Sequence, residues 1–133
     1  MPSAAELVQL NKQTTLASWM AQGGWNPIPI ERAEGIYIYA ADGKRYMDWS
    51  SQLVNVNLGH SHPRVVKAIQ EQAAKLCYVS PGYATEPRGR LGELLSEVTP
   101  GNLTKAFFTN GGADAIENAM KMARLYTGRQ KIL

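Results

Sequence analysis

Residues 110–114, with the sequence Asn-Gly-Gly-Ala-Asp, have residue types and a spacing that suit the binding of a charged group. The apolar run at 106–109 predicts a buried strand before them, and a helical pattern begins at about Ala113. The first N–H groups of a helix have no partner within it, and the helix dipole places partial positive charge there. Because Gly111 and Gly112 let the backbone approach an anion closely, the turn predicts a phosphate site.

A second interpretation of this turn needs no ligand. The spacing is neither the Gly-x-Gly-x-x-Gly pattern of dinucleotide sites nor a Walker loop, since no lysine follows the glycines. A tight strand-to-helix connection also uses glycine for its backbone angles. From the residues alone, the phosphate site and the ordinary turn both remain open.

Other candidate groups indicate structure rather than chemistry. His60 and His62 are the two histidines of the chain, and no carboxylates or thiols cluster near them in the sequence to complete a metal site. We expect them to hydrogen-bond to the backbone where a helix begins. Cys77 ends an apolar helical pattern and has no adjacent basic residue, so we expect a small core residue. With no nucleophile elbow and no paired carboxylates, the residues predict an anion site and no catalytic group.

The elements that must position these residues follow from the spacing of apolar side chains. A loosely helical arm is expected over residues 4–22, and the glycines and prolines at 23–29 then give extended chain. Two β-prone runs on either side of residues 41–44, Ala-Asp-Gly-Lys, predict a hairpin.

The remainder of the chain has mostly helical spacing. Three helices are predicted, over 63–76 with a proline in the first turn, over 86–98 with Thr85 as N-cap, and over 113–127 with Gly128 as C-cap. Strands are predicted at 106–109 and at 131–133. Helices that alternate with strands indicate an α/β fold.

Length and composition restrict the class of protein. The chain has 133 residues, of which 44% are hydrophobic, as expected for an ordinary globular domain. The excess of basic residues, 14 against 11 acidic ones, is small and scattered, which argues against a nucleic-acid partner. Apolar stretches are too short for a membrane span. A single cysteine, and polar residues where a signal peptide would need its apolar core, lead us to expect a cytoplasmic protein.

The C-terminal residues 129–133 have the pattern of a strand that has just begun. One interpretation is that the chain is a piece of a larger protein. The other is a short, frayed terminus without significance.

Four segments of the sequence form a recognisable series. They are Ala-Glu-Gly-Ile-Tyr-Ile at 33–38, Asp-Gly-Lys-Arg-Tyr-Met-Asp at 42–48, Gly-His-Ser-His-Pro at 59–63 and Phe-Phe-Thr-Asn-Gly-Gly-Ala-Asp-Ala at 107–115. In this order they resemble the class III aminotransferases, enzymes of fold type I that depend on pyridoxal phosphate. The similarity extends from about Trp25 to Leu133. The Asn-Gly-Gly-Ala-Asp segment most resembles the branch that contains taurine–pyruvate and related ω-amino-acid transaminases.

The resemblance implies roles for individual residues. Gly112 and Ala113 match the turn whose N–H groups bind the cofactor phosphate. Many relatives have serine or threonine at the position of Ala113, and their hydroxyl adds a bond that alanine lacks. Trp19, Leu53 and Val54 match positions that line the substrate pocket. Residues 80–83 match a loop that reaches the site of the partner subunit, which implies a homodimer.

The resemblance also implies what this chain does not contain. The lysine that forms the Schiff base with the cofactor lies beyond residue 133 in the family, and Lys105, Lys121 and Lys131 do not match it. No catalytic residue is therefore assigned to this chain. The implied organisation is an N-terminal arm over 1–24, the first part of the small domain with a linking helix over 25–84, and the start of the cofactor-binding large domain over 85–133.

The implied activity is transfer of an amino group from an amine or ω-amino acid to a keto acid such as pyruvate, by a longer enzyme of which this chain is the N-terminal part. A racemase or a decarboxylase of the same family is the alternative that keeps the cofactor. A non-catalytic module that binds phosphate or forms dimers is the alternative outside enzymes.

Overall fold

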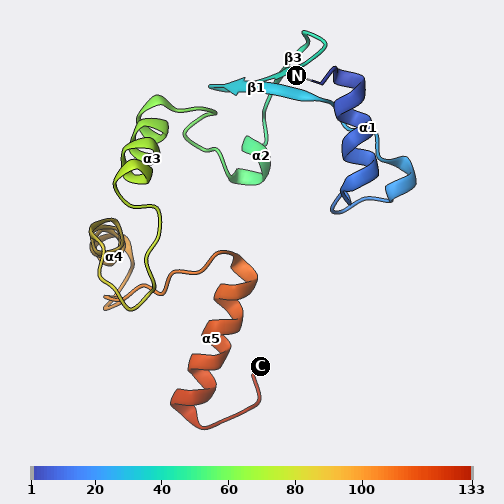
Figure 1. Cartoon of the computed structure of the whole chain (residues 1–133). Coiled ribbons are helices and arrows are strands. Elements are labelled where there is room, and N and C mark those ends of the chain that lie inside the picture. The colour runs from blue at the N-terminus through green and yellow to red at the C-terminus, as the bar shows by residue number, and fades with distance from the viewer. Residues whose placement is uncertain (1, 133) are drawn as a thin grey trace. The chain divides into compact units, whose positions relative to one another are not determined.

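The computed structural model describes residues 2–132, and the chain divides into two compact units between Tyr78 and Val79. The first unit contains a three-stranded sheet and the second contains helices (Figure 1). Their combined content of helices and strands confirms a mixed α/β protein.

The N-terminal arm begins with helix α1, Ala4–Thr14. Its start is a capping box, in which the hydroxyl of Ser3 accepts from the N–H of Glu6 and the Glu6 carboxylate accepts from the N–H of Ser3. The helix stops eight residues before the predicted end at 22. The hydroxyls of Thr14 and Thr15 donate to carbonyl oxygens four residues earlier, and Thr15 is already extended. After a loop, a short 3₁₀ turn η1, Gln22–Gly24, follows.

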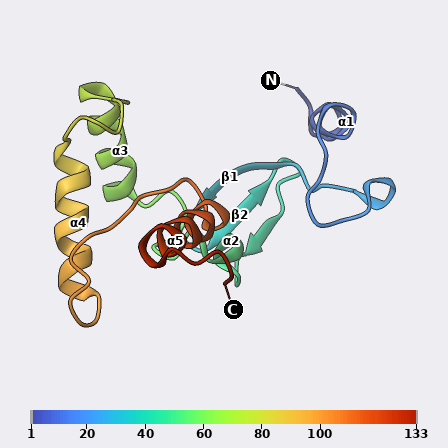
Figure 2. The same cartoon turned by 90° about the horizontal axis from the view of Figure 1, so that it is seen from below.

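The sheet consists of β1 (Ile30–Glu34), β2 (Tyr37–Ala40) and β3 (Arg45–Met47), all antiparallel and in that order (Figure 2). The predicted hairpin of β2 and β3 is confirmed. Its turn is closed by the Asp42 carboxylate, which accepts from the N–H of Lys44 at 3.0 Å. Strand β1 was not predicted, because its Ile-Glu-Arg-Ala-Glu sequence has only two apolar residues and follows two prolines.

Apolar packing within the sheet is slight. Ala40, at the end of β2, is the one described hydrophobic residue that is buried, with 2% of its surface exposed. Arginine side chains cover two of the tyrosine rings instead. The guanidinium carbon of Arg32 lies 3.5 Å from the ring centre of Tyr39, and that of Arg45 lies 4.3 Å from the ring centre of Tyr37.

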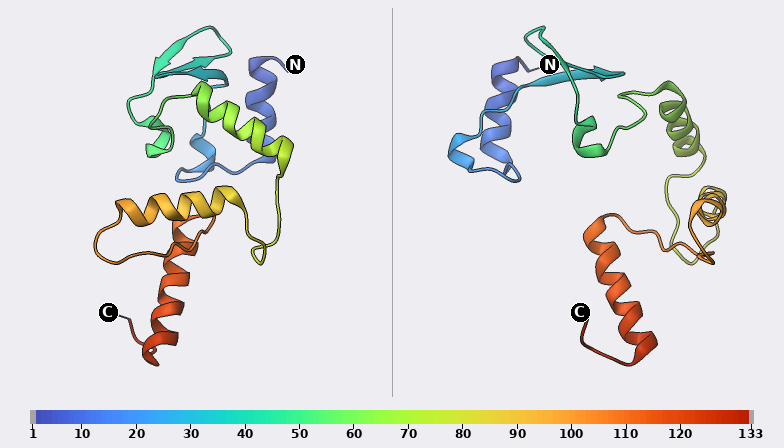
Figure 3. Two further views of the ribbon diagram at one scale, coloured as in Figure 1. Left: turned by 90° about the vertical axis from the view of Figure 1, so that its left-hand side faces the viewer. Right: turned by 180° about the vertical axis from the view of Figure 1, so that it is seen from behind.

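Three longer helices follow the sheet and agree with the predictions. They are α3 (Pro63–Lys75), which ends the first unit, and α4 (Glu86–Val98) and α5 (Gly112–Thr127) in the second. Thr85 is the N-cap of α4, although its side chain makes no capping bond. Gly128 ends α5 with φ of 69°, and the chain then turns back beside the helix (Figure 3).

The two strands predicted in the second unit are not formed. Residues 103–109 and 129–132 run without strand pairing, and the described part of this unit contains no strand. Residue 133, the last of the second predicted strand, lies outside the described residues. A strand needs a neighbouring strand that accepts hydrogen bonds from its N–H groups and donates hydrogen bonds to its carbonyl oxygens. These two segments do not pair with each other. The apolar pattern can identify a segment that is able to pair, but it does not identify a partner strand.

Candidate functional site

The predicted phosphate turn lies at the N-terminus of α5. Gly111 is the N-cap and makes no side-chain capping bond. Its carbonyl accepts from the N–H of Ala115 at 3.0 Å, which is the first bond of the helix. The N–H groups of Gly112, Ala113 and Asp114 therefore precede the first intrahelical bond, as expected for the first turn of a helix. The predicted start of the helix is confirmed, whereas phosphate binding stays a prediction.

The space in front of this turn is compatible with a phosphate. A Cβ built on Gly112 would meet no atom within 4 Å, and one built on Gly111 would meet only a carboxylate oxygen of Asp114, at 3.9 Å. The hydroxyl of Thr109 donates to the Gly111 carbonyl at 3.1 Å and fixes the entry of the chain into the turn. The donors are all backbone N–H groups at the positive end of a sixteen-residue helix, which is the donor set that binds phosphate.

The three predicted pocket residues all belong to the first unit and are exposed. The exposed fractions are 88% for Trp19, 64% for Leu53 and 71% for Val54. Trp19 lies in a loop that the Gln22 side chain closes, since the Gln22 amide binds both the N–H and the carbonyl of Ala17. All three residues have positive φ, between 59° and 65°. Their common role in lining a pocket stays a prediction.

Leu53 and Val54 belong to α2, Ser51–Val54, a single turn whose four residues all have positive φ. A left-handed backbone costs roughly 1–2 kcal/mol for each residue that has a Cβ, and a β-branched residue such as Val54 rarely adopts it. Such a run persists only where surrounding contacts determine it. Sequence analysis did not predict this turn, because Ser-Gln-Leu-Val contains no glycine or asparagine to indicate positive φ.

The carboxylate of Asp48 provides these contacts. One of its oxygens accepts from the N–H and the hydroxyl of Ser50, at 3.3 and 3.2 Å, and from the N–H of Gln52 at 3.3 Å. The other oxygen lies 2.7 Å from Nε2 of His60. The two side chains are largely buried, with 3% of Asp48 and 13% of His60 exposed. We call this pair the Asp48–His60 clasp.

The surroundings of Asp48 favour its charged form. Burial acts to raise the pKa of the Asp48 carboxyl, but the hydrogen bonds from His60, Gln52 and Ser50 outweigh it, and the pKa lies below its ordinary value. A carboxyl whose pKa is lowered in the folded state stabilises that state above its unfolded pKa. This contribution is lost as the pH falls through the folded value.

The histidines depart from their predicted role. The ring of His60 binds the Asp48 carboxylate rather than the backbone, and Nδ1 of His62 is buried without a partner in the described chain. The exposed Cys77 is likewise not the core residue that its pattern predicted. No group of three potential metal ligands exists among residues 2–132. Nor does any described helix combine the length and the apolar character needed to cross a membrane.

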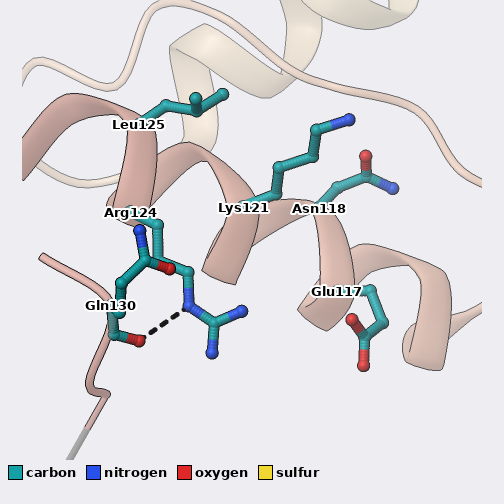
Figure 4. Close-up of a pocket in the computed structure, with 6 residues that line it drawn as sticks. All are labelled: Glu117, Asn118, Lys121, Arg124, Leu125 and Gln130. Atoms are coloured by element: carbon teal, nitrogen blue, oxygen red, sulfur yellow. Dashed lines mark hydrogen bonds between the residues drawn. The ribbon is translucent and has the colours of Figure 1, made fainter. Parts of the chain in front are cut away.

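A hollow in the second unit lies elsewhere, along α5 from Glu117 to Leu125 (Figure 4). Nε of Arg124 donates to the carbonyl of Gln130 at 2.8 Å, which holds the last described residues against the helix. Neither Gly112 nor Ala113 lines this hollow. It is lined by Glu117, Asn118, Lys121, Arg124, Leu125 and Gln130.

Comparison with known proteins defines the class to which this sheet and turn belong. Residues 19–133 match the family model of the class III aminotransferases, so the match begins before the similarity seen from Trp25. The chain belongs to this family. It is similar to the structure of a taurine:2-oxoglutarate aminotransferase from Bifidobacterium kashiwanohense, with 47% identity and a TM-score of 0.90, over 98% of this chain and 29% of that one.

Two curated relatives show the range of names within the family. An acetylornithine aminotransferase of Archaeoglobus fulgidus is 42% identical over 80% of this chain and 28% of its own length. A glutamate-1-semialdehyde 2,1-aminomutase of Rhodopirellula baltica is 42% identical over 83% of this chain and 24% of its own length. The chain therefore spans less than a third of these relatives, and it matches the N-terminal part of class III aminotransferase structures.

The base of the clasp gives a testable prediction. Gly59 has φ of 92°, and a Cβ there would lie 3.3 Å from the Gly35 carbonyl oxygen, next to the bridge between Gly35 and His60. In the complete enzyme, Gly59→Ala should lower the free energy of unfolding by roughly 2–3 kcal/mol. Gly43→Ala is the matched control, since Gly43 has φ of 84° and open space around it, and should cost about 1 kcal/mol. Equal losses in denaturant unfolding would show that the approach to Gly35 is unimportant.

Proposed function

We propose that this chain is the N-terminal part of a pyridoxal phosphate-dependent transaminase that moves an amino group from an amine or ω-amino acid to a keto acid. The observation that carries the proposal is the Gly111–Asp114 turn at the start of α5, in a chain that belongs to the class III aminotransferases. The taurine:2-oxoglutarate aminotransferase to which the chain is similar supports an ω-amino donor and adds 2-oxoglutarate as a candidate acceptor. We therefore propose 2-oxoglutarate beside pyruvate as acceptors to be tested.

In this proposal the turn binds the cofactor through its phosphate. The N–H groups of Gly112 and Ala113 donate to the phosphate oxygens, and the dipole of α5 adds favourable charge. Ala113 contributes its N–H alone, since it has no hydroxyl. Bound pyridoxal phosphate supplies the capacity to accept electrons from the donor carbon and so to exchange the amino group. The residue that attaches the cofactor is not in this chain.

The remaining assignments extend this proposal. Trp19, Leu53 and Val54 contribute apolar surface to the donor pocket, where they would exclude water and orient the carbon chain of the donor. We propose that residues 1–24 form the arm, 25–84 the first part of the small domain and 85–133 the start of the large domain. The enzyme acts as a homodimer, with residues 80–83 reaching the partner's site.

The test uses the complete enzyme that carries this chain. Taurine, β-alanine, 4-aminobutyrate and acetylornithine are each supplied as donor, with pyruvate or 2-oxoglutarate as acceptor, and the amino-acid product is measured. We expect turnover with at least one ω-amino donor. Racemisation or carbon dioxide release without amino transfer would instead favour the alternative chemistries of the family. The absence of all three reactions, in a protein with bound cofactor, would contradict the assignment as an enzyme of this class.

A further inference from the structure

The segment between Asp48 and His60 is a loop whose two ends meet. The N–H of Asp48 donates to the Ile36 carbonyl at 2.8 Å, and His60 exchanges two backbone hydrogen bonds with Gly35, at 2.8 and 3.0 Å. Both ends are thus attached beside the start of β2, and the Asp48–His60 clasp joins their side chains. Short loops with adjoining ends, stabilised by their own side chains, are frequently functional.

Among residues 2–132, the hydrogen bonds that hold the left-handed turn of α2 all come from within this loop. Besides the bonds to the Asp48 carboxylate, the side-chain amide of Asn55 donates to the Gln52 carbonyl at 2.8 Å. The N–H of Val54 donates to the Ser50 carbonyl at 3.0 Å. The side chains of Leu53 and Val54 are exposed and contribute no burial that could compensate for their backbone conformation. The conformation therefore depends on polar groups, of which Asp48 is the most buried.

We propose that Asp48 and His60 are positioning residues that fix the left-handed turn Ser51–Val54 and thereby set the affinity of the enzyme for its amino donor through Leu53 and Val54. This inference rests on the proposed function, since it requires that the two apolar side chains contact the donor. Neither clasp residue touches substrate itself. They act by fixing the position at which the exposed side chains of Leu53 and Val54 lie.

The main variant is Asp48→Asn in the complete enzyme with bound cofactor. Both carboxylate oxygens of Asp48 accept hydrogen bonds, and an amide can keep only one acceptor. The variant removes the charge that strengthens these bonds, and it keeps the contact with His60 only if that ring carries its proton on Nδ1 and accepts from the new amide N–H. We expect KM for the donor to rise about tenfold, KM for the keto acid to rise with it, and kcat to stay within about twofold. His60→Phe, which removes the ring nitrogen, should act in the same direction.

A glycine in the turn separates positioning from general damage. Gln52→Gly removes the energetic cost of positive φ at that residue. It keeps the backbone N–H that donates a hydrogen bond to the side chain at position 48. In the Asp48→Asn background it should return KM for the donor at least halfway to the original value. Since the glycine also relieves about 1–2 kcal/mol of backbone strain, denaturant unfolding must show that both variants are fully folded under the assay conditions. Asp42→Asn, at the exposed carboxylate of the hairpin turn, is the matched control and should leave KM unchanged.

Hydrogen exchange makes the result independent of activity. The amides of Gln52, Val54 and Asn55 are all hydrogen-bonded in the turn. In Asp48→Asn they should exchange at least about tenfold faster, while the amides of α3 are unchanged. Faster exchange with an unaltered KM would overturn the proposal, and so would unaltered exchange. If the original enzyme transfers no amino group at all, the proposed function fails, and the exchange result still decides whether the clasp holds the turn.

Discussion

Replacing Ala113 with proline should weaken the binding of pyridoxal phosphate to the complete enzyme by about tenfold to a hundredfold, the effect of one lost hydrogen bond to a charged group. Ala113 is the second residue of α5, and its N–H is one of the proposed phosphate donors. Proline removes that N–H. The helix itself should tolerate the change, because α4 already has Pro87 at the same position.

Two further substitutions at this position make the result specific. Ala113→Gly keeps the N–H and should leave cofactor affinity within about twofold. Ala113→Ser adds a hydroxyl that can donate to the phosphate, and it should strengthen binding severalfold. Affinity is measured by titrating the cofactor-free enzyme and following the absorbance of the bound cofactor. If the proline variant binds as tightly as the glycine variant, the N–H of Ala113 is not a phosphate donor.

The polypeptide of residues 1–133 alone should show neither transaminase activity nor a cooperative thermal transition. No residue in it matches the lysine that attaches the cofactor, so catalysis requires a residue that it lacks. Ala40 is the one described hydrophobic residue that is buried, whereas the large apolar side chains of α5, such as Ile116 and Leu125, are exposed. Burial of apolar surface is the dominant favourable contribution to folding, and neither unit shows enough of it.

Circular dichroism and a dye that binds exposed apolar surface measure the folding of this polypeptide, and product formation is compared with a control without protein. The complete enzyme, assayed in parallel, is the positive control. A sharp transition of the monomeric polypeptide would instead favour the small module that binds phosphate. Turnover above the control would contradict the assignment of the catalytic lysine to another part of the enzyme.

The elements that could be predicted from the sequence are those that form from local interactions. The hairpin depends on the Asp42-Gly43 turn, and α3, α4 and α5 depend on helical spacing with prolines and glycines at their ends. The strands predicted at 106–109 and 131–133 are not formed, because strand pairing needs a partner that neither segment has among residues 2–132. The apolar pattern at 106–109 cannot distinguish a segment that is paired from one that is only able to pair.

The candidate site was predictable in part for the same reason. The turn proposed to bind phosphate is a contiguous sequence, and its helix begins where the pattern indicated. The clasp joins residues twelve positions apart, and neither Asp48 nor His60 indicates the other. The left-handed turn was unpredictable in a stronger sense, because Leu53 and Val54 are residue types that ordinarily avoid positive φ.

In the loop between Asp48 and His60, the residues that determine the backbone path are different from the residues whose side chains are exposed. The path depends on the clasp, on Gly59 and on backbone bonds to Gly35, whereas Leu53 and Val54 contribute little to it. Under the proposed role of Leu53 and Val54 in the donor pocket, directed evolution of donor range can therefore randomise these two positions with little loss of folded enzyme. Libraries that include asparagine and glycine there should be enriched in stable members, since these residues accept positive φ more readily than valine. Randomising the clasp would instead disturb the loop whatever the donor.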